Sequence, residues 1–262
     1  MTIADFSKQL KLAYIKKNYG NHIKEALDLS DSYESFLEKL LQAELENRQS
    51  NRIQTLVRAS KLPSKTTFDD YLTSHLDPKL QKQVIELKSL SFIEQKENLI
   101  LIGNPGVGKT FLATVLGVEA CLTGKSVLFI SLPNLVIELK EAMSANQLTY
   151  YKRRFSKYDL VILDELGYVS FDQVGSEILF NLLSNRNNSG SMIITTNLGF
   201  ERWEETFKDP MLTAAIVDRL AHHWFELKKC ILFVLKGRSV IQLEQMRIDV
   251  KKVIYRLPFG TF

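Results

Sequence analysis

Cysteine and long hydrophobic runs are scarce in this sequence, and each scarcity excludes a class of protein. The chain contains two cysteines, Cys121 and Cys230, which is too few for a disulfide framework. Both lie in apolar surroundings, which indicates buried thiols in a reducing cytosol. The longest apolar runs span a handful of residues, whereas a bilayer-spanning helix needs about 20. The N-terminus also lacks the apolar segment of a secretory signal. We therefore expect a cytoplasmic protein with no membrane partner.

The overall composition is that of an ordinary globular protein. Hydrophobic residues make up 45% and charged residues 24% of the 262 residues, which leaves room for one α/β domain with a small helical appendage. Lys and Arg number 34 against 30 Asp and Glu, a net charge of +4. This excess is too small to indicate a polyanionic partner by itself, so only the local distribution of charge can do so.

Proline is absent before Pro63, and the first part of the chain has a helical pattern. Asp31 and Glu34 have the spacing of a helix-capping pair. Leucines then recur at helical intervals. They are Leu37, Leu40, Leu41 and Leu45. We expect a small all-helical N-terminal domain over residues 1–65, with its boundary in Lys61–Thr67, and a connecting segment over 66–97.

The pattern then changes to short apolar runs that alternate with helical stretches. The runs are apolar at successive positions, as strands buried on both faces require. They are Asn98–Ile102, Ser126–Ser131, Asp159–Asp164, Ser191–Thr196 and, less clearly, Trp224–Leu235. Helices are expected at Lys109–Leu122 and Val174–Asn185 between them. The alternation predicts an α/β core over residues 98–238, a parallel sheet covered by helices on both faces, with a basic tail at 239–262.

A phosphate-binding pattern follows the first apolar run. The residues are Gly103, Asn104, Pro105, Gly106, Val107, Gly108, Lys109 and Thr110, which fit G-x-x-x-x-G-K-[ST]. Glycines let backbone N–H groups turn toward an anion, and the following helix adds its positive dipole end. Lys109 is expected to reach the β- and γ-phosphates of ATP, and the Thr110 hydroxyl to coordinate Mg²⁺. A chance glycine-rich turn is the competing explanation, but the strand before it and the helix after it favour a phosphate loop.

Polar residues end the third and fourth runs, where the carboxyl ends of parallel strands carry ligand sites. Asp164 is the candidate for holding Mg²⁺ through its water shell, and Glu165 for activating the attacking water. Asn197 is a candidate for hydrogen-bonding that water or the γ-phosphate. The alternatives are a solvated strand end for the two acids and a simple chain turn for Asn197.

Together these segments resemble the AAA+ ATPases, and in particular the IstB type of transposition helper ATPase. The resemblance rests on FIEQKENLILIGNPGVGKTFLAT, YDLVILDELGY, SMIITTNLGF and DPMLTAAIVDRLAHHWFEL, together with the helical leader, and covers about Ser32 to Arg238. It implies an AAA+ core related to the DnaC and DnaI helicase loaders, with Asn197 as first sensor. It also implies that Arg219 is an arginine finger acting on a neighbouring subunit; its ordinary alternative is an ion pair with Asp218 or a neighbouring helix.

One departure from that family lies after the last expected strand. The family has an arginine, a candidate second sensor, where this chain has Ile241. Either Arg238 or Arg247 replaces it, or the nucleotide is bound without that contact, so we assign no second sensor.

Clusters of basic residues suggest contacts to DNA. The candidates are Arg48, Arg52 and Arg58 in the leader, and Lys152, Arg153 and Arg154 beside two tyrosines. Each cluster alone is more typical of a solvated surface. Together, in a chain that resembles DNA-handling ATPases, they favour contacts to the duplex backbone without sequence preference.

The sequence therefore predicts a DNA-stimulated ATPase that uses ATP and Mg²⁺, binds duplex DNA without sequence specificity and assembles into ATP-dependent oligomers. The resemblance implies target selection for, and stimulation of, a cognate insertion-sequence transposase. The alternatives are a DnaC/DnaI-like replicative helicase loader and a non-hydrolysing, nucleotide-gated DNA-binding module.

Overall fold

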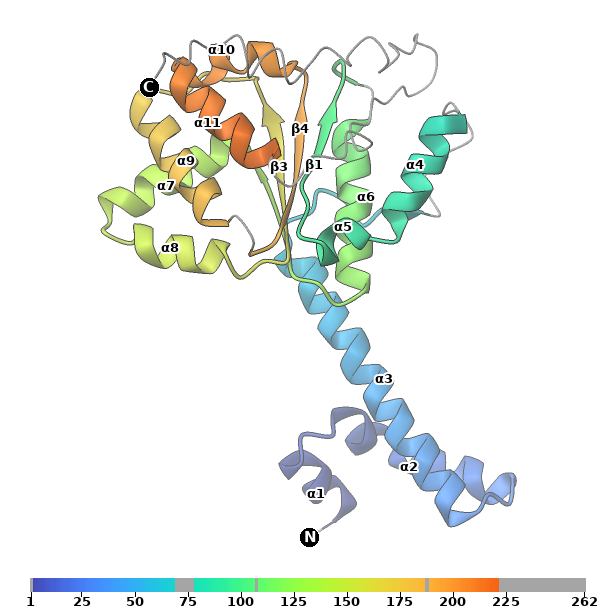
Figure 1. Cartoon of the computed structure of the whole chain (residues 1–262). Coiled ribbons are helices and arrows are strands. Elements are labelled where there is room, and N and C mark those ends of the chain that lie inside the picture. The colour runs from blue at the N-terminus through green and yellow to red at the C-terminus, as the bar shows by residue number, and fades with distance from the viewer. Residues whose placement is uncertain (1, 69–77, 107, 187–188, 222–262) are drawn as a thin grey trace. The chain divides into compact units, whose positions relative to one another are not determined.

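The computed structural model describes residues 2–68, 78–106, 108–186 and 189–221, which form two compact units (Figure 1). The first unit extends to Thr55 and the second begins at Leu56. Within the described ranges, no helix combines the length and apolar character needed to span a membrane. Cys121 is buried as expected, and burial raises the pKa of its thiol to about 11. Cys230 lies outside the described residues.

The first unit contains three helices with breaks between them: α1 (Ile3–Gln9), α2 (Ala13–Asp28) and the first part of α3 (Tyr33–Ala59). The expected capping pair at Asp31 and Glu34 is wrong by one residue. The Ser32 hydroxyl instead accepts the Ser35 N–H at 3.1 Å, and Asp31 accepts the Lys39 amine at 2.6 Å. A serine adjacent to an aspartate can provide the same cap, so the sequence pattern did not distinguish between them.

A buried glutamate joins α3 to the beginning of α2. Glu44 Oε2 accepts the N–H groups of Tyr14 and Ile15 at 2.8 and 3.1 Å, where α2 has no cap of its own. Arg48 Nε donates to Glu44 Oε1 at 2.9 Å. Burial raises the pKa of Glu44, but the Arg48 hydrogen bond and the two amides outweigh it, so the pKa lies below its ordinary value. A side chain from one helix therefore caps another.

The second unit alternates strands and helices. Its strands are β1 (Leu99–Ile102), β2 (Val127–Ser131), β3 (Leu160–Leu166) and β4 (Ser191–Thr196). Its helices are α4 (Pro78–Lys88), α5 (Ser91–Glu94), α6 (Lys109–Leu122), α7 (Leu132–Ser144), α8 (Leu148–Phe155), α9 (Gln173–Arg186), the 3-10 helix η3 (Phe200–Arg202), α10 (Glu204–Phe207) and α11 (Pro210–Ala221).

The strands form a parallel sheet of order β1-β4-β3-β2 in the described part of the chain. Four of the predicted apolar runs are these four strands, and the expected parallel α/β sheet is confirmed. The fifth run, Trp224–Leu235, lies outside the described residues. The carboxyl ends of all four strands meet at one edge of the sheet, which we call the carboxyl edge.

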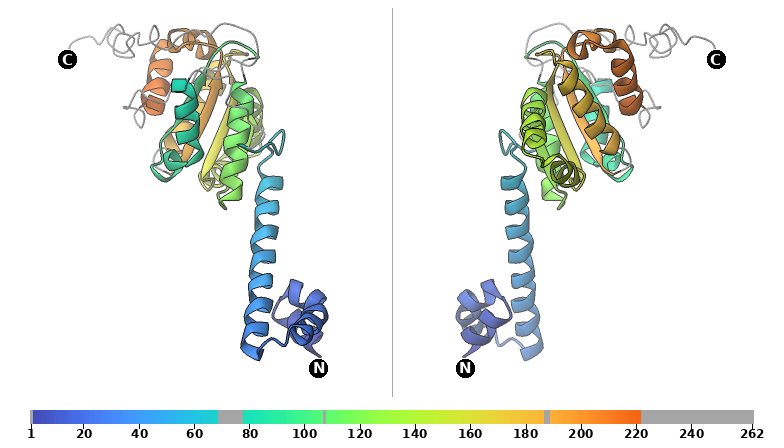
Figure 2. Two further views of the ribbon diagram at one scale, coloured as in Figure 1. Left: turned by 90° about the vertical axis from the view of Figure 1, so that its right-hand side faces the viewer. Right: turned by 90° about the vertical axis from the view of Figure 1, so that its left-hand side faces the viewer.

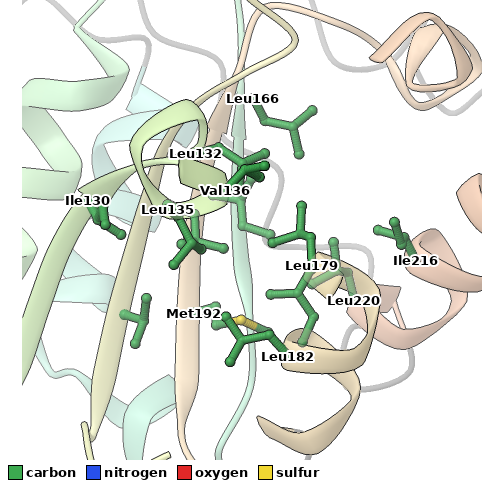
Figure 3. Packing of buried hydrophobic residues seen from close by; sticks show 14 of the residues in the cluster. Ile130, Leu132, Leu135, Val136, Leu166, Leu179, Leu182, Met192, Ile216 and Leu220 are labelled. Carbon is green, nitrogen blue, oxygen red and sulfur yellow. The ribbon is translucent and has the colours of Figure 1, made fainter. Parts of the chain in front are cut away.

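Successive residues of each strand face opposite sides of the sheet, so both faces carry a hydrophobic core. Ile100 and Ile102 pack with α7, α9 and α11 in the cluster that Figure 3 shows. Leu99 and Leu101 pack with α4, α5 and α6 on the other face. In Figure 2, α4 and α6 lie in front of the strands in one view, and α7 and α9 in the other. This double burial explains why the runs are continuously apolar.

The segment expected to connect the domains contributes to the second core. Val84 and Leu87 of α4 and Phe92 of α5 are all buried against α6 and the sheet. Leu56 and Val57, at the end of α3, pack against the same cluster. The two units thus divide inside α3, and the domain limits 1–65, 66–97, 98–238 and 239–262 remain predictions.

Candidate active site

The glycine-rich loop from Gly103 to Thr110 connects the end of β1 to the start of α6. Its first N–H, from Gly103, donates to the carbonyl of Thr196 at 3.2 Å, which fixes the loop to the last residue of β4. Gly108 caps α6 with a φ of 91°, a left-handed conformation that favours glycine. The helix then begins at Lys109, so its N-terminal N–H groups lie at the loop. Val107 lies outside the described residues.

Lys109 is held inside this loop. Its side chain is buried, and its amine donates to the carbonyls of Gly103 at 2.7 Å and Asn104 at 2.9 Å. Burial lowers the pKa of the amine below its ordinary value, and the Asp164 carboxylate opposes that shift. A lysine ammonium has three donors, so one remains for an anion. The loop therefore holds this cation at the N-terminus of α6 with one donor still available.

Thr110 and Asp164 come together at the carboxyl edge. The Thr110 hydroxyl donates to Asp164 Oδ1 at 2.8 Å, and the Thr195 hydroxyl donates to the same oxygen. Asp164 is only 5% exposed, so these hydroxyls compensate for the loss of water around its charge. A hydroxyl and a carboxylate are oxygen ligands of the kind that Mg²⁺ prefers. The residues present therefore fit magnesium held between the loop and β3.

Glu165 lies next to Asp164 but differs from it in environment and backbone. Its side chain is exposed, and its φ of 67° is left-handed, which is uncommon for a residue with a Cβ. Its N–H donates to the Thr195 hydroxyl at 3.1 Å. The β3–β4 pairing is irregular at this point, between Leu163 and Leu166. One acid is thus buried and the other exposed, and their predicted roles stay predictions.

Asn197 directly follows β4 and is half-buried. Within the described ranges, its Oδ1 is buried and has no hydrogen-bond partner. A Cβ added to Gly167 would lie 3.2 Å from this oxygen. The same Cβ would lie 2.6 Å from a methyl of Leu198. Gly167 has a φ of 98° and is therefore needed for both conformation and space. Among the described residues, Asn197 Oδ1 is therefore an acceptor without a protein partner, close to Gly167 and two residues after β4's Thr195.

Arg219 belongs to α11, and its side chain lies outside the description. The next residue, Leu220, accepts a 3.5 Å hydrogen bond from Asn98 Nδ2, and Asn98 Oδ1 accepts the Met192 N–H at 3.0 Å. Asn98 precedes β1, and Met192 is the second residue of β4. The end of α11 therefore lies at the amino ends of β1 and β4, an edge of the sheet that we call the amino edge and that is opposite the phosphate loop.

The basic residues proposed for DNA lie in different settings. Arg48 is committed to Glu44 and donates from Nη2 to the Lys11 carbonyl at 2.7 Å, whereas Arg52 and Arg58 are exposed. The structure brings the second cluster together in the last turn of α8, just before β3, and hence at the amino edge. It consists of Lys152, Arg153 and Arg154, of which the last two are exposed.

Two site residues were not assigned from the sequence. Thr195 contacts both acids, and Gly167 makes room for Asn197. A threonine inside a strand is ordinary β-sheet composition, so the only available signal was its polarity at the end of an otherwise apolar run.

A parallel sheet with a glycine-rich loop and an acid pair at its carboxyl edge defines a P-loop nucleoside-triphosphatase fold of the AAA+ class. The fold is shared with DnaA from Aquifex aeolicus, solved with AMPPCP bound, at a TM-score of 0.53 and 17% identity over 77% of this chain and 62% of that one. The chain itself belongs to the IstB-like ATP-binding protein family, whose sequence pattern matches residues 6–230.

Two relatives align over most of their length. One is described as an ATP-binding protein of insertion sequence IS5376 from Geobacillus stearothermophilus, 34% identical over 95% of this chain and 97% of the relative. The other belongs to IS232 of Bacillus thuringiensis, 37% identical over 81% and 87% respectively. The resemblance to IstB and AAA+ proteins predicted from the motifs is thus confirmed.

Proposed function

We propose that this chain is a Mg²⁺-dependent ATPase that assists transposition of an insertion sequence. Its family membership and the names of its relatives support the association with insertion sequences and ATP. The observation that carries the chemistry is the group formed by Lys109, Thr110 and Asp164, which joins a buried cation and two oxygen ligands at one helix N-terminus. An anionic, metal-bound ligand fits this combination.

In this proposal the phosphate loop and Lys109 bind the triphosphate of ATP, and Thr110 and Asp164 hold Mg²⁺. The metal, when bound, neutralises charge on the phosphates. Glu165 accepts a proton from the attacking water, a role that its exposed carboxylate allows. Asn197 orients that water through its unpaired Oδ1, or the γ-phosphate through its Nδ2 donor.

Arg219 acts on a neighbouring subunit in this proposal. β1 has four residues, which span about 13 Å at 3.3 Å each, and the end of α11 lies at the far end of that strand from the loop. This position of the helix end supports a finger that acts across a subunit interface on a neighbouring ATP site. Hydrolysis then requires self-association, in line with the ATP-dependent oligomers expected from the sequence.

Duplex DNA and a cognate transposase are the proposed partners. The exposed Arg153 and Arg154 of α8, with Arg52 and Arg58 of α3, are the candidates for phosphate contacts. Arg48 is a weaker candidate because Glu44 and a carbonyl engage its guanidinium. Contacts of this kind give affinity that falls steeply with salt and carries no sequence preference. Relatives matched over nearly their whole length belong to insertion sequences, which favours a transposition helper over a helicase loader.

The test is the ATPase rate per subunit, measured with and without duplex DNA over a range of protein concentrations. We expect the rate to rise with concentration and with DNA. Lys109→Ala should abolish it, since the loop loses its cation, whereas Lys125→Ala, which removes a surface ion pair to Glu94, should leave it unchanged. Nucleotide binding without measurable turnover would instead support the non-hydrolysing module.

A further inference from the structure

The two acids of the site lie on a β-bulge. Leu163 pairs with Ile194 and Leu166 pairs with Thr196, so that Asp164 and Glu165 together face the single residue Thr195. Two residues against one is the definition of a bulge, and bulges beside active sites re-aim side chains. The bulge separates the environments of the two acids: Asp164 is buried and Glu165 is exposed.

The side chain of Thr195 contacts both residues of this bulge. Its hydroxyl donates to Asp164 Oδ1 and accepts the Glu165 N–H at 3.1 Å. The direction of each bond is fixed, because a carboxylate only accepts and a backbone N–H only donates. Thr195 is 2% exposed, so within the fold its hydroxyl has no access to bulk water. Both bonding directions of the hydroxyl are thus committed to the acid pair.

We infer that Thr195 is a positioning residue that holds Asp164 and Glu165 in their separate roles. Through the first bond it fixes the carboxylate that would hold the metal. Through the second it stabilises the left-handed backbone of Glu165, a conformation that is unfavourable for a residue with a Cβ. The inference rests on the proposed ATPase function, whose residues it orients.

The test compares three substitutions on the same strand. Thr195→Val removes the hydroxyl at nearly constant shape, and Thr195→Ser keeps the hydroxyl. Ser191→Ala is the matched control, because it removes a fully buried hydroxyl at the other end of β4 that donates to the Phe92 carbonyl at 3.0 Å and touches neither acid. Thermal melting of each variant monitors folding.

We expect Thr195→Val to lower kcat about tenfold or more, with the KM for ATP changed less than about threefold. Thr195→Ser should restore most of kcat, and Ser191→Ala should behave as wild type. The Mg²⁺ concentration needed for half-maximal binding of a fluorescent ATP analogue should rise in Thr195→Val alone. Wild-type kcat and Mg²⁺ dependence in Thr195→Val, or equal losses in Thr195→Val and Ser191→Ala, would overturn the inference.

The Mg²⁺ dependence of analogue binding also distinguishes failure of this inference from failure of the proposed function. If the wild-type protein hydrolyses no ATP, the proposed function fails. A shifted Mg²⁺ dependence of analogue binding in Thr195→Val would still support the positioning role, and an unshifted one would refute it.

Discussion

Asp164 and Glu165 are adjacent in sequence but differ in almost every physical respect. The first is buried and accepts two hydroxyls, while the second is exposed on a left-handed backbone. A buried carboxylate whose Oδ1 accepts two hydroxyls is suited to a fixed charge, whereas an exposed carboxylate can exchange protons with water. The difference arises from the bulge and not from residue type, since both are acids.

At the residue scale, Glu165→Gln should lower ATP hydrolysis by about a hundredfold or more, because the amide cannot accept the water's proton. ATP-bound oligomers should then remain on DNA, which a dissociation experiment after dilution would measure. Glu177→Gln changes an exposed glutamate on α9 and serves as the control. Rapid release of Glu165→Gln from DNA would contradict the assignment of Glu165 as base.

At the scale of elements, the sequence predicted α6 and β4 to the residue, because α6 has a glycine cap at its start and β4 has an apolar centre, Met192–Ile194, between polar ends. The strand predicted to end at Asp164 continues to Leu166. That extension requires a left-handed Glu165, which single-residue preferences disfavour. The order of the strands in the sheet was also not predicted. An apolar run indicates that a strand is buried but does not indicate which strands it pairs with.

The cap that α3 supplies to α2 leads to a pH-dependent prediction. The folded pKa of Glu44 lies below its ordinary value of 4.5, so its stabilisation is complete above that pH and is lost as pH falls through the lower, folded value. After correction for intrinsic exchange, the amides of Tyr14 and Ile15 should lose hydrogen-exchange protection below about pH 4.5.

Glu44→Gln should remove this pH dependence and cost about 1–2 kcal/mol of local stability, the usual worth of a helix cap. Glu46→Gln, an exposed change on the same helix, should keep the wild-type profile. Equal protection in wild type and Glu44→Gln at every pH would show that the carboxylate does not cap α2.

At the scale of the assembled molecule, the position of α11 leads to a subunit-mixing prediction. Lys109→Ala subunits keep Arg219 but lose the loop cation, and Arg219→Ala subunits have the opposite defect. Mixed in equal amounts, they should recover about a quarter of the wild-type ATPase rate, since a quarter of head-to-tail interfaces would join an intact loop to an intact arginine.

The measurement is steady-state hydrolysis at a fixed total concentration, with each variant assayed alone as the control. Co-purification of two differently tagged variants would establish that the subunits mix. Mixed oligomers without any recovered activity would assign Arg219 to the loop of its own subunit.

The two hydrogen bonds from Lys109 to loop carbonyls have a thermodynamic consequence for ligand binding. The ammonium is already desolvated and its side-chain torsions are already restricted. The desolvation free energy and the loss of side-chain entropy are therefore part of the free energy of folding and not of ligand binding. In the proposed ATPase, phosphate therefore meets a pre-organised receptor and loses little affinity to rearrangement. The same rigidity limits which residues can replace Lys109. The planar guanidinium of an arginine would need carbonyl groups in different positions, so a positive charge alone is not sufficient for this site.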